Sequence, residues 1–157
     1  MNRFIAVSLS VATLAALAPV RAEAQASPFV GKWAVEITAG MRIEDGEPTP
    51  IRAKATLAIV ETGDSLVATL TVEPNENVPP RPPARFAAAK VAGNAVTFLQ
   101  RSEARLNANG EERTAWMVST WALTVSGNAI SGDVRREIEG GMGPSMPAQP
   151  LSGTRVP

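Results

Sequence analysis

Hydrophobic and polar residues alternate with a period of two through most of the chain after residue 29, a pattern typical of β-strands. The alternating runs are separated by turn sequences rich in Gly and Asn, such as Thr62-Gly63-Asp64 and Ser126-Gly127-Asn128. No run shows the 3.6-residue period of an amphipathic helix. The pattern predicts strands at residues 30–38, 51–61, 65–73, 85–91, 95–102, 114–125, 129–138 and 150–156.

The connections between these runs differ in composition. Residues 39–50 and 103–113 are polar and are predicted to be long loops. Residues 74–83 are rich in Pro and are predicted to form a stiff surface loop. Residues 139–149 form a loop of Gly, Met and Pro. Each connection is able to join adjacent antiparallel strands, which predicts an up-and-down order.

The predicted fold class is all-β, an eight-stranded antiparallel barrel. Eight strands suffice to close a sheet around side chains or one small ligand, and closure removes the exposed strand edges that invite aggregation. A two-sheet β-sandwich is the alternative fold.

The N-terminus resembles a secretory signal. Met1-Asn2-Arg3 is basic, residues 4–17 are apolar, and small residues at the motif Ala24-Gln25-Ala26 suit a signal peptidase. We therefore predict a signal peptide at residues 1–26 and a single β-barrel domain at residues 27–157, exported to the periplasm or secreted. No later apolar run is long enough to span a membrane.

Charge and composition limit the binding partners and the kinds of active site that the chain can have. Cleavage after Ala26 would leave 13 basic and 14 acidic residues, so the mature chain offers no electrostatic case for nucleic acid. The chain has no Cys, His or Tyr, which excludes a Cys nucleophile, a Ser-His-Asp triad and the usual zinc or haem ligands. We predict no metal, no cofactor and no catalytic residue.

The motif Gly31-Lys32-Trp33 opens the first predicted strand. It resembles the start of the lipocalin and avidin-like barrels, the calycin group. The resemblance implies that Trp33 closes one barrel end, that a basic residue of the last strand packs across its ring, and that the connection after the first strand covers the ligand mouth. Arg155 is in phase on the last strand. The resemblance does not extend to a Thr-Asp-Tyr-like triplet, a C-terminal helix or a disulfide.

Inward phases identify candidate ligand-binding residues. Small residues at Ala53, Ala55, Ala68 and Gly132 would either flatten the barrel or leave a cavity. Arg136 shares the phase of inward apolar residues, and a guanidinium there needs an anionic ligand, a protein carboxylate or a position at the rim. The predicted ligand-binding residues are Trp33, Met41, Gln100, Trp116 and Arg136.

The strand at 114–125 has two apolar faces, so its phase leaves open which face points inward. With Trp116 inward, Trp121 and Leu123 form an outer apolar surface for a second copy or another protein. Three hypotheses follow: binding of a small apolar or amphipathic ligand, a protein-interaction module with a free arm at residues 25–29, and an isomerase or cyclase with a pocket in the barrel.

Overall fold

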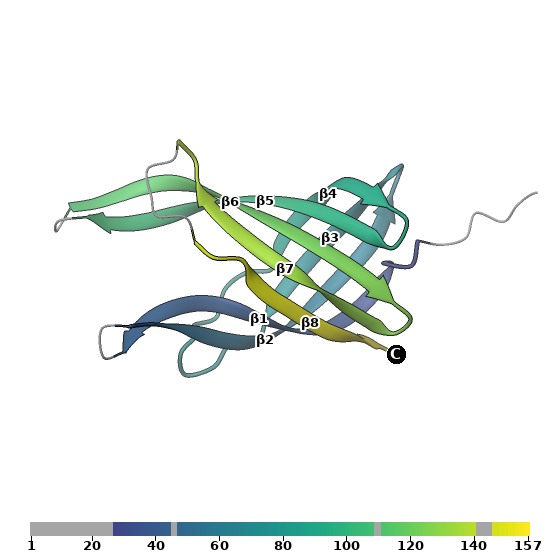
Figure 1. The fold of residues 1–157 in the computed structure, drawn as a ribbon, viewed down its shortest axis with the longest axis horizontal. Coiled ribbons are helices and arrows are strands. Elements are labelled where there is room, and N and C mark those ends of the chain that lie inside the picture. Colours follow the sequence, from purple (N-terminus) through teal and green to yellow (C-terminus); the bar gives the residue numbers. More distant parts are fainter. Residues whose placement is uncertain (1–26, 45–46, 109–110, 141–145) are drawn as a thin grey trace, which may run out of the picture.

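The computed structural model describes residues 27–44, 47–108, 111–140 and 146–157. The predicted signal sequence at residues 1–26 lies outside them. The described residues form eight strands and no helix (Figure 1). No helix in these ranges is long and apolar enough to cross a membrane. The strands are β1 Gly31–Glu44, β2 Glu47–Thr62, β3 Ser65–Val72, β4 Ala84–Ala92, β5 Ala95–Ala108, β6 Glu111–Ser126, β7 Ala129–Ile138 and β8 Gln149–Val156.

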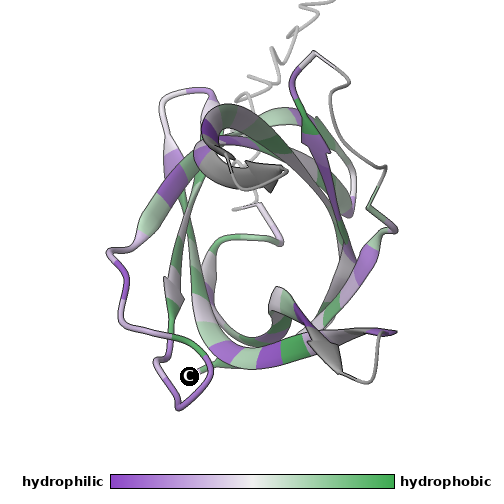
Figure 2. Cartoon of the chain, turned by 90° about the vertical axis from the view of Figure 1, so that its left-hand side faces the viewer, coloured by the Kyte–Doolittle hydropathy of each residue, from purple (hydrophilic) through white to green (hydrophobic). Residues whose placement is uncertain are grey.

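The strands form one closed antiparallel barrel in sequence order, with β8 returning to pair with β1. Viewed along the barrel, they make a complete ring (Figure 2). The predicted up-and-down barrel is confirmed, and the sandwich alternative is wrong. Glycines at positive φ, among them Gly63 at 61° and Gly127 at 58°, allow the tight turns that keep consecutive strands adjacent.

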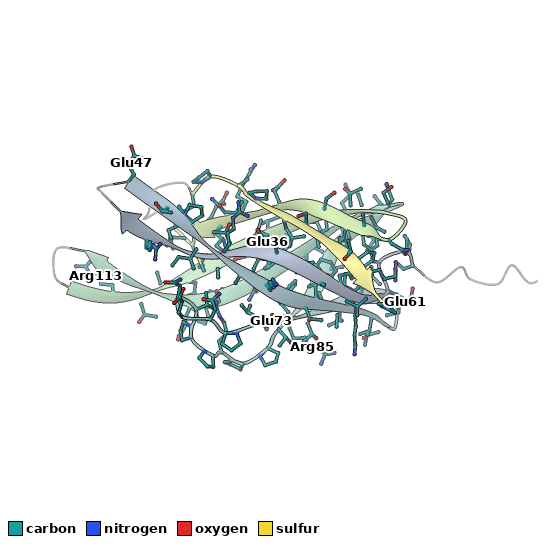
Figure 3. All side chains as sticks on the ribbon, turned by 90° about the horizontal axis from the view of Figure 1, so that it is seen from below. Glu36, Glu47, Glu61, Glu73, Arg85 and Arg113 are labelled. Carbon is teal, nitrogen blue, oxygen red and sulfur yellow. The ribbon has the colours of Figure 1, made fainter. Side chains whose placement is uncertain are left out.

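Two of the predicted loops are wrong, because β1–β2 and β5–β6 are long hairpins. Pairing continues to Glu44 opposite Glu47 and to Ala108 opposite Glu111. Both hairpins extend beyond the other strands (Figure 1), and Figure 3 shows Glu47 and Arg113 on these extensions. Outside the barrel neither face of a strand needs apolar residues, so the extensions lack the alternation that identifies a strand. The extension of β1 takes the place of the predicted lid.

The barrel has two unlike ends. The turns after β2, β4 and β6 lie at one end with residues 27–30 and the C-terminus, and we call this the closed end. The β1–β2 and β5–β6 hairpins, the connection after β3, the end of β7 and the start of β8 lie at the other, which we call the open end. The antiparallel order places them so.

The predicted inward faces are confirmed by burial. Inward residues of β1, β2, β3, β5, β7 and β8 form one apolar core. An aromatic cluster lies within it: the Phe86 ring stacks on Trp121 with centroids 5.2 Å apart and meets Phe98 edge-on at 5.7 Å. Such pairs add roughly 0.5–1.5 kcal/mol beyond area burial.

Two core residues come from segments predicted to lie outside the core. Phe29 is 0% exposed, so the predicted free arm is wrong at this residue. Val78, in the Pro-rich loop, is also buried, and it exchanges two backbone hydrogen bonds with Asn75. The bonds fold the first half of the loop into a turn, which presents Val78 to the core.

Two inward glycines lie very close to the backbone of a neighbouring strand. A Cβ on Gly132 would clash with the carbonyl oxygen of Ala122, and one on Gly153 with that of Ala34. Ala53, Ala55 and Ala68 are buried in the packed core. None of Ala53, Ala55, Ala68 and Gly132 lines the open-end pocket described below, so these small residues do not form the predicted cavity there.

Candidate ligand-binding site

The closed end is sealed by Trp33 and Arg155. Trp33 is fully buried, and the guanidinium carbon of Arg155 lies 4.2 Å from the centre of its ring. The two residues face each other in the β1–β8 register. This confirms the cation–π contact that the resemblance implied, an arrangement contributing roughly 0.5–2 kcal/mol.

Arg155 also ties the segment before β1 to the barrel. Its Nη1 donates to the carbonyl of Val30 at 2.6 Å and its Nη2 to that of Pro28 at 2.7 Å. The Trp33 Nε1 donates to the carbonyl of Phe29 at 2.9 Å. Gly31 has φ of 136°, and a Cβ there would lie 2.6 Å from Arg155 Nη1. Gly31 and Arg155 are therefore both part of the contact that joins residues 28–30 to the closed end.

The open end contains a pocket of about 370 Å³, which we call the mouth pocket. This volume lies at the lower end of the range for small-molecule sites. The Pro-rich loop contributes Arg81 and Pro82 to its rim, beside Ala84 at the start of β4. Its apolar wall consists of Ile37, Ala39, Leu70, Val72, Met117 and Trp121.

One side of the mouth pocket is a row of polar residues across three strands, which we call the polar row. Gln100 of β5 is opposite Ser119 of β6, and Ser119 is opposite Arg136 of β7. All three line the mouth pocket. Ser119 is 3% exposed, so the row reaches into the barrel as well as along its rim.

Arg136 lies where β8 no longer covers the barrel wall. The last β7–β8 pair is Val134 with Gln149, and the last β1–β8 pair is Glu36 with Ser152. The Arg136 side chain crosses the resulting gap, and its Nη2 donates to the carbonyl of Thr38 at 3.2 Å. Among the described residues, no carboxylate forms an ion pair with it, so the predicted internal salt bridge is not observed there.

The electrostatic surroundings of Arg136 disfavour its charge. Burial lowers the pKa of its guanidinium below the ordinary value, and the positive charge of Arg81 lowers the pKa further. An arginine remains protonated at neutral pH in proteins. The mouth pocket therefore contains a partly desolvated cation without a protein counter-ion among the described residues.

The predicted ligand-binding residues divide into two groups. Gln100 and Arg136 come together in the mouth pocket. Trp33 lies at the closed end, and Met41 and Trp116 are 44% and 42% exposed. None of these three lines the mouth pocket.

Of the two orientations that the sequence left open for β6, the one with Trp116 inward is wrong. Trp121 and Leu123 are each 1% exposed and belong to the core, so they form no outer surface. Trp116 faces outward, where the Arg101 guanidinium lies 4.1 Å from its ring centre and binds both carboxylate oxygens of Glu139 at 3.0 and 2.7 Å. The Arg101 contact covers part of the exposed indole.

Two buried polar atoms near this region have no hydrogen-bond partner. The Trp121 Nε1 donor and the Thr38 Oγ1 hydroxyl are buried and unpaired. Trp121 lines the mouth pocket, and Thr38 carries the carbonyl that Arg136 binds. Unpaired buried polar groups are uncommon in folded proteins, and these two belong to a residue that lines the mouth pocket and to one that Arg136 contacts.

Sequence reasoning missed Arg81 and Ser119. Arg81 is the only charged residue of the 79–83 segment Pro-Pro-Arg-Pro-Pro. A single cation in a stiff loop is the feature that could have identified it as a candidate site residue. Ser119 is the polar residue that interrupts the inward phase of Met117, Trp121 and Leu123. A polar residue at an inward position marks a site where burial is incomplete or a ligand is met.

No cluster of three or more His, Cys, Asp or Glu side chains in the described ranges is arranged to hold a metal ion. No protein-family model, curated protein or solved structure matches the chain.

Proposed function

We propose that this chain is an exported, calycin-type barrel that binds a small amphipathic molecule in the mouth pocket. The observation that carries the proposal is the asymmetry of the barrel. Trp33 and Arg155 seal one end, whereas the other end holds a pocket that is lined both by apolar residues and by the polar row. A site of this kind matches a molecule with one apolar and one polar part.

Export is supported by the N-terminal sequence pattern, in which a basic start and an apolar run precede a small-residue cleavage motif. The calycin relationship is supported by Gly31, Trp33 and Arg155, which have the arrangement implied by that resemblance.

The protein-interaction hypothesis loses the two features on which it depended. Trp121 and Leu123 lie inside the barrel, and Phe29 is buried at the closed end rather than in a free arm. Ligand binding is therefore the function that the geometry favours.

The test is a titration with the neutral apolar fluorophore N-phenyl-1-naphthylamine, whose emission rises in an apolar site. We expect saturable binding to one site and energy transfer from Trp121. Ser119→Leu places bulk in the mouth pocket and is expected to weaken binding at least about tenfold, or 1.4 kcal/mol. Thr120→Leu changes the adjacent residue on the outer face and is expected to leave affinity unchanged.

Circular dichroism checks that Ser119→Leu is folded, and Ala84→Leu at the rim serves as a second blocking variant if it is not. Absence of saturable binding to the wild-type chain would refute the proposal. Equal affinity of the wild type and a folded blocking variant would refute the location of the site.

A further inference from the structure

The segment before β1 is held against the closed end from Ser27 onward. The Val30 N–H donates to the Ser27 carbonyl at 3.0 Å. The carbonyls of Pro28 and Val30 both accept hydrogen bonds from Arg155. Phe29, between them, is fully buried. The ends of a folded chain fray unless contacts of this kind tie them down, so this segment is a fixed part of the barrel.

The Glu61 carboxylate, near the closed-end terminus of β2, contacts the backbone nitrogen of Ser27. The Ser27 N–H donates to Glu61 Oε1 at 3.1 Å. The Glu61 side chain is exposed at the closed end (Figure 3). Among the described residues, no Lys or Arg forms an ion pair with it. Its carboxylate is therefore available to a positive charge at the position of the Ser27 nitrogen.

The same nitrogen belongs to the bond that signal-peptide cleavage is predicted to cut. Hydrolysis of the Ala26–Ser27 peptide bond by a signal peptidase consumes one water molecule, and it leaves a carboxylate on Ala26 and an α-amino group on Ser27. An ordinary α-amino group has a pKa of about 7.7–8.0 and is mostly protonated at pH 7. Cleavage at this bond therefore replaces the neutral N–H that contacts Glu61 by an ammonium group.

The surroundings of Ser27 favour an ion pair at this position. The Arg155 guanidinium binds the carbonyl of the next residue, Pro28, so an ammonium on Ser27 adds a second positive charge to this end of the barrel. The Glu61 carboxylate offsets that charge at hydrogen-bonding distance. The Ser27 Oγ is buried, which shows that this residue packs against the barrel and holds its nitrogen beside the carboxylate.

We infer that Glu61 is the binding site for the N-terminus that export creates: removal of residues 1–26 frees the Ser27 ammonium, and the Glu61 carboxylate binds it. The closed end then gains an ion pair that the precursor lacks. This inference rests on the export part of the proposed function and is independent of the mouth pocket. It gives signal-peptide removal a role in the stability of the barrel.

The first test identifies the N-terminus of the exported protein. The full chain is expressed in a bacterial host, purified from the periplasm, and analysed by intact mass spectrometry and N-terminal sequencing. We expect a chain that begins at Ser27. A periplasmic chain that begins at another residue would overturn the inference while leaving export intact. Retention of the whole N-terminal segment in the cytoplasm would instead refute the export part of the proposed function.

The second test measures the pairing itself, as the rate at which acetic anhydride labels the Ser27 α-amino group at pH 7. An ion pair stabilises the protonated amine, which does not react, so Glu61→Gln is expected to raise the rate about 1.5- to 5-fold. Glu76→Gln is the matched control, because Glu76 is an exposed carboxylate at the open end and its loss changes the net charge equally. We expect no change in the control. Equal rates in the wild type and Glu61→Gln, or an equal rise in both variants, would overturn the inference.

The third test separates the ion pair from the neutral hydrogen bond by calorimetric unfolding. Gln keeps an acceptor oxygen without the charge, so Glu61→Gln is expected to lower the Tm of the chain that begins at Ser27 by about 1–3 °C. A chain that begins at Ala24 has an amide at the Ser27 nitrogen, and there the same substitution is expected to cause a smaller loss. Equal losses in the two chains would show that only the neutral hydrogen bond matters and would overturn the inference.

Discussion

Arg155→Met tests how the closed end is held. The substitution keeps an apolar cover over Trp33 and removes the charge and the fork. It deletes hydrogen bonds of 2.6 and 2.7 Å to the Val30 and Pro28 carbonyls, together with the cation–π contact at 4.2 Å. Hydrogen bonds to charged groups are worth about 1.5–3 kcal/mol each and the cation–π contact roughly 0.5–2 kcal/mol.

These contributions do not add fully, because the Arg155–Pro28 bond is exposed and water can replace the guanidinium there. We therefore expect the free energy of unfolding to fall by about 3 kcal/mol, a large fraction of the 5–15 kcal/mol typical of a domain. The corresponding fall in Tm is roughly 10 °C for a domain of this size.

Urea unfolding followed by tryptophan fluorescence measures the loss of unfolding free energy. An unchanged m-value would show that the two proteins can be compared as two-state folders. Arg135→Met removes an exposed arginine and is the control, expected to change the free energy by less than about 0.5 kcal/mol. A loss below about 1 kcal/mol in Arg155→Met would refute the reasoning, because Arg155 would then act as an ordinary surface cation.

Three further substitutions have distinct expected outcomes. Arg136→Met removes a partly buried charge that has no counter-ion among the described residues. It is expected to raise the free energy of unfolding of the ligand-free protein by roughly 1 kcal/mol; a fall of that size in urea unfolding would contradict this. Gly132→Ala pushes a Cβ into the Ala122 carbonyl and is expected to cost about 2 kcal/mol, so an unchanged urea midpoint would contradict the close approach. The hydrogen bond from Arg101 lowers the pKa of the Glu139 carboxyl, so any stabilisation from this pair is present above about pH 4.3 and is lost as the pH falls through the lowered pKa. An NMR titration should show that lowered pKa, and Arg101→Met should return it to the ordinary range; the same pKa in both proteins would contradict the contact.

The barrel was predictable because its interior imposes a strict alternation on every strand. Trp33, Leu57 and Ile130 all point inward as their phases predict. The Arg155–Trp33 contact was also predictable, since closing an eight-stranded sheet places the last strand beside the first. These features depend on burial, which leaves a clear record in the sequence.

The hairpin extensions were not predictable in this way, because outside the barrel both faces of a strand can be polar. The orientation of β6 was missed for a related reason. Ser119 lies inward and Trp116 outward, so one polar and one large apolar residue of that stretch contradict the usual rule. Ser119 lines the mouth pocket, and residues of functional sites often depart from the rule that inward positions are apolar.

The mouth pocket itself could be predicted only in part. Gln100 and Arg136 share inward phases and were found, whereas Arg81 reaches the pocket from the Pro-rich loop. Strand periodicity carries no information on where a loop returns, and the turn closed by Asn75 and Val78 sets the path that brings Arg81 to the rim.

The most direct test of the central claim is a crystal structure of the protein with N-phenyl-1-naphthylamine. The account predicts density in the mouth pocket, in contact with Leu70, Val72 and Trp121. An empty mouth pocket at saturating N-phenyl-1-naphthylamine, or density only outside it, would contradict the account.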